Sequence, residues 1–292
     1  MAEVKREYVI YADSGADIPG EKLSEWGVRN CPLTFTFEGE DSSHTGEDMN
    51  IREFYDRMRE GGVAHTAALN YSTAAEYFRR DLELGRDVFY LAFSSGLSST
   101  YATSCTVADD LMAEFPGGKI VVVDSLAASS GHGLLLWLCV QKKREGADID
   151  SLREYAEGIR QNICHWFTVD DLVYLRRGGR VSATAALAGT VLGIKPVLHV
   201  DSEGHLINIM KVRGRKASIK AIADKFGELR RPDINGTVFI SNGDCKEDAD
   251  FLAELLKERY GVSVSLISDI GPVIGAHSGP GTLALFFLGE HR

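Results

Sequence analysis

The chain lacks several features that would each indicate a particular class of protein. Its five cysteines include no Cys-x-x-Cys pair, which argues against a disulfide framework and against a zinc site built from such pairs. No apolar run reaches the length of a membrane-spanning helix, and the first residues do not read as a secretory signal peptide, so we expect a cytoplasmic protein without a transmembrane segment. The net charge of −10, without a dense run of Lys or Arg, argues against nucleic acid as a partner.

Catalytic signatures are scarce too. There is no Gly-x-x-x-x-Gly-Lys-Ser/Thr loop, so we do not expect this chain to bind ATP, and no paired His or carboxylate spacing indicates a metal or other cofactor. Phe93-Ser94-Ser95-Gly96 lacks the glycine that stands two residues before the nucleophile in α/β-hydrolases. The alternative function is still a serine-dependent lipid hydrolase or acyltransferase, with Ser95 as nucleophile and His277 as base.

Strand and helix patterns alternate along the chain. Apolar runs at 8–12, 28–37, 88–93 and 119–123 predict strands, and helical patterns lie between them. This alternation over the first 160 residues predicts an α/β fold with a parallel sheet covered by helices on both faces. The helix expected at 133–142 is apolar all round, which predicts burial between layers. An amphipathic helix at 151–163 would end this part, and an alanine-rich helix is expected at 182–192.

Small polar residues follow three of the predicted strands. The three pairs are Asp13-Ser14, Ser94-Ser95 and Asp124-Ser125. The carboxyl ends of parallel strands form the edge where α/β proteins bind ligands, so we expect these side chains to gather there. A few residues after Ser94 and Ser95, the run Ser98-Ser99-Thr100 opens a helix, whose unpaired N–H groups and dipole would favour an anion. The alternative is that one of the two serines only caps that helix.

Two further candidates lie near glycines. Arg180 follows Gly178-Gly179 at the end of a predicted helix, where a guanidinium could fix hydroxyl or carboxylate groups, or only cap the helix carbonyls. His277 stands among glycine, serine and proline and not on an apolar face. A lone histidine is usually structural, but a loop is where functional groups are commonly positioned.

Seven segments, in this order, resemble the DegV family of bacterial fatty-acid-binding proteins, which includes the binding subunits of the fatty acid kinase system. They are ADSGADIP, the loop with Thr66, SSGLSSTY, DSLAASSGHG, LVYLRRGGRVS, GIKPVL and GPVIGAHSGPGTLAL. The resemblance covers nearly the whole chain. It implies an N-terminal α/β domain with a three-layer parallel sheet over residues 1–165 and a mixed α/β domain over 166–292. Between the two domains it implies a buried tunnel that holds one fatty acid.

The resemblance also implies roles for individual residues. Thr66 and Ser95, or the neighbouring Ser94, would meet the carboxylate of the acid at the helix N-terminus. Arg180 and His277 match the Gly-Gly-Arg and His-x-Gly-Pro-Gly motifs of the family. They would form a supporting polar network, to which we add three residues from the predicted strand ends: Asp13, Ser14 and Ser125. The sequence departs from the family where Thr-Ser-Gln-Pro is common, since it reads Thr66-Ala67-Ala68-Leu69.

The ligand implied by the resemblance is a long-chain acid such as palmitate, stearate or oleate. A kinase catalytic subunit would phosphorylate the bound acid to an acyl phosphate, as a step toward phospholipid synthesis. This chain would then present the substrate, with no catalytic residue and no metal of its own. Burying about fourteen methylenes would contribute on the order of 11 kcal/mol before the costs of association.

Overall fold

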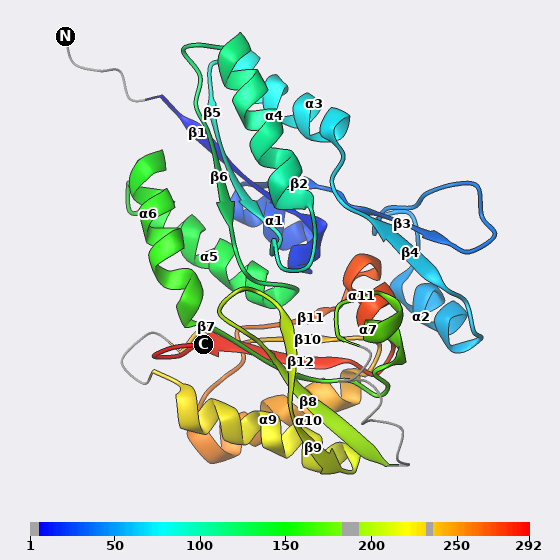
Figure 1. Cartoon of the computed structure of the whole chain (residues 1–292). Helices are drawn as coiled ribbons and strands as arrows, with labels where there is room; N and C mark the ends of the chain where they lie inside the picture. Colours follow the sequence, from blue (N-terminus) through cyan, green and yellow to red (C-terminus); the bar gives the residue numbers. More distant parts are fainter. Residues whose placement is uncertain (1–5, 183–192, 232–235) are drawn as a thin grey trace.

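The computed structural model describes residues 6–182, 193–231 and 236–292, which form two sheets stacked one above the other (Figure 1). The first sheet is parallel, with strand order β2-β1-β5-β6. Its strands are β1 (Tyr8–Asp13), β2 (Val28–Cys31), β5 (Asp87–Ala92) and β6 (Ile120–Asp124). Every residue of β1 and β5 is buried, as expected for strands of a parallel sheet that is covered on both faces.

Helices cover both faces of this sheet. On one face α3 (Tyr71–Glu83) and α4 (Thr100–Glu114) pack through Phe78 and Leu111 against Tyr11 and Tyr90. The helices of the other face are α1 (Gly20–Trp26), α5 (Ser130–Arg144) and α6 (Ile149–Ile159). α5 also packs on the second sheet, so it lies between the two sheets and most of its apolar residues are buried, while Trp137 and Leu138 are partly buried. This confirms the burial that its sequence predicts.

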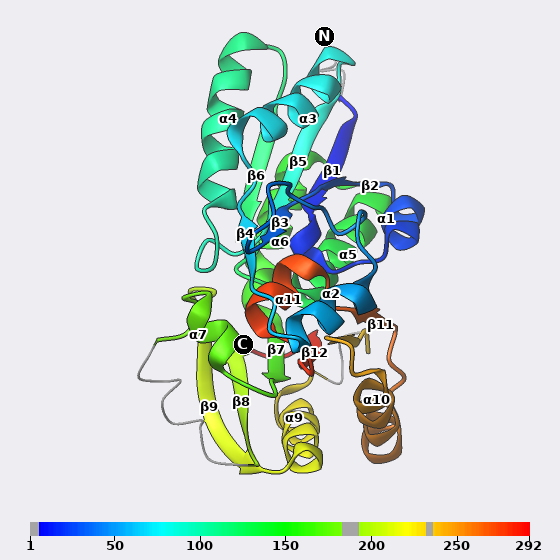
Figure 2. The same cartoon turned by 90° about the vertical axis from the view of Figure 1, so that its right-hand side faces the viewer.

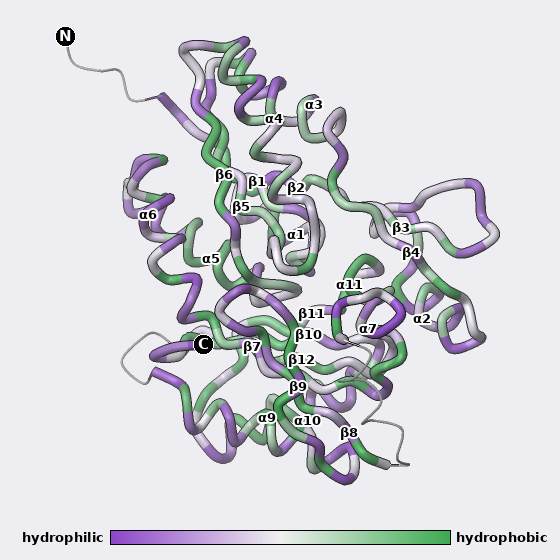
Figure 3. Tube along the Cα trace, in the orientation of Figure 1, coloured by the Kyte–Doolittle hydropathy of each residue, from purple (hydrophilic) through white to green (hydrophobic). Residues whose placement is uncertain are grey.

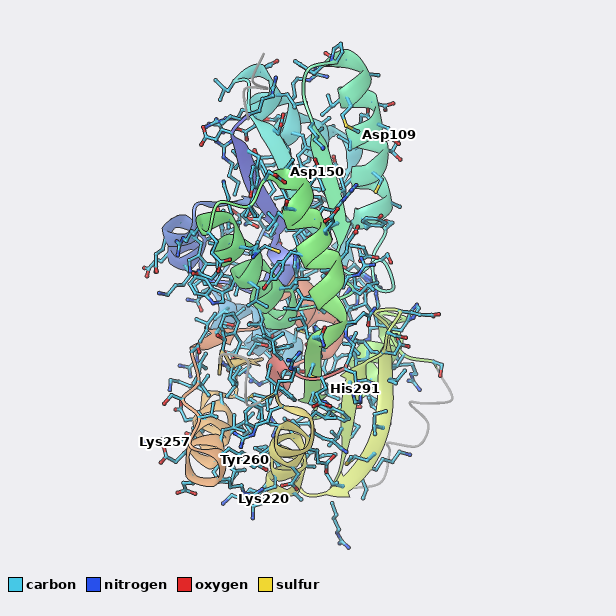
Figure 4. The ribbon with its side chains drawn as sticks, turned by 90° about the vertical axis from the view of Figure 1, so that its left-hand side faces the viewer. Asp109, Asp150, Lys220, Lys257, Tyr260 and His291 are labelled. Atoms are coloured by element: carbon cyan, nitrogen blue, oxygen red, sulfur yellow. The ribbon has the colours of Figure 1, made fainter. Side chains whose placement is uncertain are left out.

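The second sheet is mixed, with strand order β11-β10-β12-β7-β8-β9. Its strands are β7 (Ile163–Thr168), β8 (Ile194–Val200), β9 (Leu206–Arg213), β10 (Phe239–Asn242), β11 (Leu266–Asp269) and β12 (Leu283–Leu288). Only β10 and β11 run parallel to each other among the described pairs of this sheet. α9 (Arg215–Leu229) and α10 (Lys246–Tyr260) cover its outer face. Lys220, Lys257 and Tyr260 mark these two helices in Figure 4, with Asp109 and Asp150 on helices of the first sheet.

A small third layer lies beside the junction of the two sheets. It contains the antiparallel pair β3 (Thr34–Phe37) and β4 (Ala64–Ala67), with α2 (Ile51–Arg59) and α11 (Pro272–Ser278) packed on it. The short helix α7 (Val173–Arg177) contacts α11. Figure 2 shows α11 in the middle of the molecule, level with the boundary between the sheets. This helix therefore brings the last part of the chain against the β3–β4 pair.

One expectation changes against the structure. The single strand expected at 28–37 is two strands in different sheets, because Pro32 has no N–H to continue a ladder. α4 begins at Thr100, as the run Ser98-Ser99-Thr100 predicts, and Ser94 and Ser95 lie in the turns before it. The domain boundary predicted after residue 165 falls within β7, a strand of the second sheet. The helix expected at 182–192 lies almost wholly outside the described residues.

The α/β fold class is confirmed, with one parallel and one mixed sheet. In Figure 3 green follows much of the central strands and α11, while the outer helices and loops mix purple and white with green. No helix in the described part of the chain combines the length and apolarity needed to cross a bilayer.

Candidate functional site

A cavity of about 310 Å³ lies between the two sheets, at the low end of the range for small-molecule sites. The first sheet contributes residues that follow its strands, and the second sheet contributes side chains of β7, β8 and β12. The β3–β4 pair and α11 close the side. Most of the lining is apolar, and its larger members include Phe93, Phe167, Leu206, Val273, Ile274 and Phe286.

Thr66, Arg180 and His277, three residues predicted from the sequence, line this cavity together. Thr66 lies on β4 and His277 on α11, and their side chains form a hydrogen bond of 2.8 Å between Oγ1 and Nε2. The two residues are 211 positions apart in sequence, so the fold alone brings them together. We call the group formed by Thr66, Ser98, Ser99, Arg180, His277 and Ser278 the polar end of the cavity.

His277 is neutral at neutral pH. Burial lowers its pKa to about 4, and the nearby charges of Arg180 and His65 act in the same direction. Its Nδ1 is buried without a hydrogen-bond partner. A proton on Nε2 leaves only a lone pair unpaired at Nδ1, so we assign that tautomer. Nε2–H then donates to Oγ1 of Thr66, and the Thr66 hydroxyl keeps its own hydrogen for a ligand.

Arg180 brings a positive charge to the polar end. Its Nε and Nη2 donate to the Leu97 carbonyl at 3.2 and 3.0 Å, and Nη1 donates to the Gly178 carbonyl. Among the described residues no carboxylate pairs with it in a salt bridge of 4 Å or less, and three of its five N–H groups are used. Burial lowers its pKa, but a guanidinium stays charged near neutral pH. The half-buried cation therefore favours an anionic ligand.

Hydroxyl groups complete the polar end. Ser98 and Ser99 line the cavity directly before the first turn of α4, where backbone N–H groups favour an anion. The Ser98 side chain pairs with Oγ1 of Thr100 at 2.9 Å, and Ser99 is exposed without a capping bond. Ser278 is 5% exposed, and its hydroxyl has no hydrogen-bond partner in the part of the chain that the structure describes. The run Ser98-Ser99-Thr100 predicts this helix start, but neither Ser98 nor Ser99 is among the site residues predicted from the sequence.

Ser94 and Ser95, which the resemblance places at the carboxylate, are not among the residues that line this cavity. Ser94 is fully buried, and its hydroxyl donates to the Gly204 carbonyl at 3.0 Å. Ser95 is exposed, and its N–H donates to Asp124 at 3.1 Å. The physical reason is the extra turn of chain between the end of β5 and the start of α4, which places the later serines at the helix N-terminus.

Asp13, Ser14 and Ser125 also lie outside the cavity lining and hold loops in place. Asp13 accepts hydrogen bonds from the Tyr90 hydroxyl and from the N–H of Phe93, a cavity residue, at 3.0 and 2.8 Å. Ser14 accepts from the N–H of Leu33, another cavity residue, at 3.0 Å. The Ser125 hydroxyl bonds to Ala127 within its own loop. Asp13 and Ser14 thus support the cavity wall and do not reach its interior.

Comparison with known proteins agrees with this arrangement. The model of a family described as "Uncharacterised protein, DegV family" matches residues 7–290. A DegV domain-containing protein of Clostridium perfringens is 39% identical over 291 residues, which cover 98% of this chain and 99% of the relative. The chain belongs to the DegV family. Two solved DegV structures have the same fold over nearly the whole chain. A DegV lipid-binding protein from Thermotoga maritima is 28% identical, with a TM-score of 0.85 over 98% of this chain and 99% of that one.

The second solved DegV structure is a family protein from Thermus thermophilus, described as binding fatty acid. It is 27% identical, with a TM-score of 0.85 over 97% of this chain and 99% of that one. The family resemblance of the sequence is therefore confirmed, and with it the arrangement of a parallel and a mixed sheet.

Proposed function

We propose that the chain binds one long-chain fatty acid in the cavity, with its carboxylate at the polar end and its tail among the apolar residues. The observation that carries this is Arg180, a half-buried cation without a carboxylate partner among the described residues, at one end of a mostly apolar cavity. Each methylene taken from water contributes about 0.8 kcal/mol, while the charged end fixes the orientation. The related proteins that are described as binding lipid or fatty acid support the same ligand class.

The carboxylate would receive hydrogen bonds from several directions at once. The Thr66 hydroxyl donates to it, held in place by Nε2–H of His277. The hydroxyls of Ser98 and Ser99 lie beside the first turn of α4, and Arg180 has two N–H groups left to donate. Hydrogen bonds to a carboxylate are charge-assisted and stronger than neutral ones, so these groups should select an acid over an uncharged lipid.

The polar end lies near the surface, which suits modification of the carboxylate by a partner. Ser99 and Ala67 are exposed beside it, while the apolar lining is mostly buried. We propose that a fatty acid kinase subunit transfers a phosphoryl group to the carboxylate oxygen and that this chain only presents the acid. No observation favours the hydrolase alternative, because Ser95 is exposed outside the cavity and Nε2 of His277 is bonded to Thr66.

Lipid extraction tests the proposal directly. Protein purified from a bacterial host should release about one long-chain acid per chain on denaturing extraction and mass spectrometry. Protein stripped of lipid should melt at a higher temperature when octadecanoic acid is added, since a ligand that binds only the folded state stabilises it. A stripped protein that shows no shift with octadecanoic or hexadecanoic acid would contradict the proposal.

Replacing Ser98 with alanine should weaken fatty acid binding about tenfold or more. The change removes one hydroxyl beside the carboxylate, and a hydrogen bond to a charged group is worth about 1.5–3 kcal/mol. Ser95→Ala is the matched control, because Ser95 is exposed outside the cavity. The Ser95→Ala variant should bind fatty acid as tightly as the natural chain. Displacement of a fluorescent fatty acid measures the affinities of both variants. A larger loss of affinity for Ser95→Ala than for Ser98→Ala would show that the carboxylate contacts Ser95 and not Ser98.

Gly178→Ala should lower affinity by at least tenfold without changing any polar group. A methyl group at this position would overlap Nδ1 of His277 and push the imidazole away from Thr66. The backbone of Gly178 is helical, with φ −72°, so alanine adds no backbone strain there. The control is Gly158→Ala on α6, where an added methyl meets no neighbour. Equal affinities of the two variants would show that the position of His277 does not matter for binding.

A further inference from the structure

The turn between β8 and β9 lies over one wall of the cavity. We call residues 201–205 the β8–β9 turn, and Val200 and Leu206, the residues on either side of it, both line the cavity. The facing wall belongs to the first sheet, where Phe93 follows β5 and Ala128 lies in the loop after β6. Figure 1 shows the tip of the β8–β9 hairpin reaching these loops. The contact between the turn and the loops therefore closes the cavity at this place.

Hydrogen bonds hold the β8–β9 turn against the rest of the protein. The turn reads Asp-Ser-Glu-Gly-His, so it has no apolar side chain to bury. The Ser94 hydroxyl donates to the Gly204 carbonyl at 3.0 Å, and the Gln161 amide donates to the Ser202 carbonyl at 2.8 Å. A segment without buried apolar contacts opens at a low free energy compared with the core. The turn can therefore separate from the first sheet while both sheets stay intact.

Arg292 joins the turn to the first sheet. Its Nη1 donates to the Asp201 carbonyl in the turn at 2.9 Å and to the Leu126 carbonyl in the loop after β6 at 2.6 Å. Its Nε and Nη2 donate to the carbonyls of Ile163 and Arg160 at 3.1 and 2.7 Å, which fix the side chain beside the start of β7. Burial lowers its pKa to about 10, so the group is charged at neutral pH. Hydrogen bonds from a charged donor are stronger than neutral ones, so Arg292 adds a strong tie to the weaker ones.

The loop after β6, on the other side of this tie, has a strained backbone. Leu126 and Ser129 have φ values of 50° and 53°, in the left-handed region that non-glycine residues rarely adopt. Ala128 and Ser129 of the same loop line the cavity. Such a conformation persists only where contacts hold it, and the Leu126 carbonyl is held by Arg292. Loss of Arg292 would therefore loosen both sides of the contact.

Two glycines allow the two sides to meet backbone to backbone. A methyl group at Gly96 would lie 2.8 Å from the carbonyl oxygen of Glu203, and one at Gly204 would overlap the Ser94 hydroxyl. There is thus no room for a side chain between the turn and the loop after β5. An acyl chain, which is as wide as a side chain, cannot pass there while the turn is in place.

We propose that the β8–β9 turn is a gate over the cavity and that Arg292 is the positioning residue that holds it closed. A fatty acid would enter and leave where the turn separates from Gly96 and Leu126. This inference rests on the proposed function, because the ligand that passes the gate is the acid bound in the cavity. Arg292 does not line the cavity, so it should control the rate of exchange and not the affinity.

Arg292→Gln should speed association and dissociation of the ligand by the same factor, about tenfold. The bonds of Arg292 belong to the closed protein whether or not the cavity is filled, so their loss raises the open fraction equally in both states. Kd should therefore stay nearly the same. Stopped-flow fluorescence on lipid-stripped full-length protein measures both rate constants with cis-parinaric acid, a naturally fluorescent fatty acid, using excess albumin to capture what dissociates. The control is Arg213→Gln, an exposed arginine at the other end of β9, which should change neither rate constant.

Gly96→Ala tests the gate independently of Arg292, and it serves if Arg292→Gln does not fold. The added methyl group would push against Glu203 and hold the turn away, while the φ of Gly96 is not positive, so alanine adds no left-handed strain there. Both rate constants should again rise together, and Gly158→Ala, whose methyl group meets no neighbour, is the control.

The outcomes separate the gate from a purely structural role. Faster dissociation with unchanged association would mean that Arg292 only stabilises the bound state, and unchanged rate constants in both folded variants would place the entrance elsewhere. Either result overturns the inference and leaves the proposed function standing. Failure of the natural chain to bind cis-parinaric, hexadecanoic or octadecanoic acid overturns the proposed function, and the inference with it.

Discussion

Methyl octadecanoate should bind at least about a hundredfold more weakly than octadecanoic acid. The ester removes the negative charge that would compensate Arg180, and it accepts fewer and weaker hydrogen bonds from Thr66 and Ser98. A hundredfold corresponds to about 2.7 kcal/mol, within the range for losing charged hydrogen bonds in a partly buried site. The apolar tail is unchanged, so the difference isolates the polar end. Isothermal titration or competitive displacement on lipid-stripped protein measures both affinities.

Arg180→Gln is the variant that makes this result specific. Glutamine keeps hydrogen-bonding capacity near the Leu97 carbonyl but removes the charge, so the acid should lose affinity while the ester changes little. Discrimination between acid and ester should then fall to about tenfold or less. The exposed arginine Arg177, three residues earlier, serves as the control for overall charge. The Arg177→Gln variant should discriminate between acid and ester as strongly as the natural chain does. If the ester binds as tightly as the acid, the polar end does not read a carboxylate.

Asp17→Asn should raise the free energy of unfolding at pH 8.5 by roughly 3–6 kcal/mol and flatten its dependence on pH. Asp17 is 8% exposed and accepts hydrogen bonds from Ser129 and from the N–H of Gly271. Burial raises its pKa from the ordinary 3.8 to about 8, with smaller contributions from Asp13 and Asp269. Each unit of pKa shift corresponds to about 1.4 kcal/mol, which sets the size of the effect.

The direction follows from the raised pKa. Between pH 3.8 and about 8 the folded chain keeps a proton on Asp17 that the unfolded chain has released. This contribution to stability is complete below pH 3.8 and is lost as the pH rises toward 8. Asparagine is neutral throughout, so the variant has no such loss. Urea denaturation at pH 6 and pH 8.5 measures it, with the exposed Asp109→Asn as control. If the natural chain loses no more stability than the Asp17→Asn variant between pH 6 and pH 8.5, the raised pKa of Asp17 is contradicted.

The sequence predicted the fold class well because its strongest signals are physical necessities of that fold. The continuous apolar runs of β1, β5 and β6 belong to a parallel sheet, and the apolarity of α5 on all sides belongs to a helix between layers. The start of α4 follows the run Ser98-Ser99-Thr100, but the serines that line the cavity were harder to predict. Ser94, Ser95, Ser98 and Ser99 all precede the helix, and only the path of the chain after β5 decides among them.

The residues of the site also differed in how well the sequence predicted them. Arg180 and His277 were recognisable because they stand beside glycines, outside any regular apolar pattern. His165 was not, since it lies within β7, whose residues are all buried, and nothing in the local sequence distinguishes a structural histidine from one that lines a cavity. Ser129 resembles an ordinary helix cap, and its bonds to Asp17 and Ser241 join segments 112 positions apart. Such partners emerge only when the two sheets are stacked.

The placement of the cavity between the sheets has a consequence for the kinetics of the ligand. Under the proposed function, the acid would become part of the packing between the two sheets, because the cavity walls come from both. The tail would leave only by giving up its contacts with both sheets, so the dissociation rate constant would depend on how often this packing loosens. Residence times should therefore be long in the isolated protein and shorten when a partner loosens the junction. Delivery would then occur on contact with that partner, without a free acid in water.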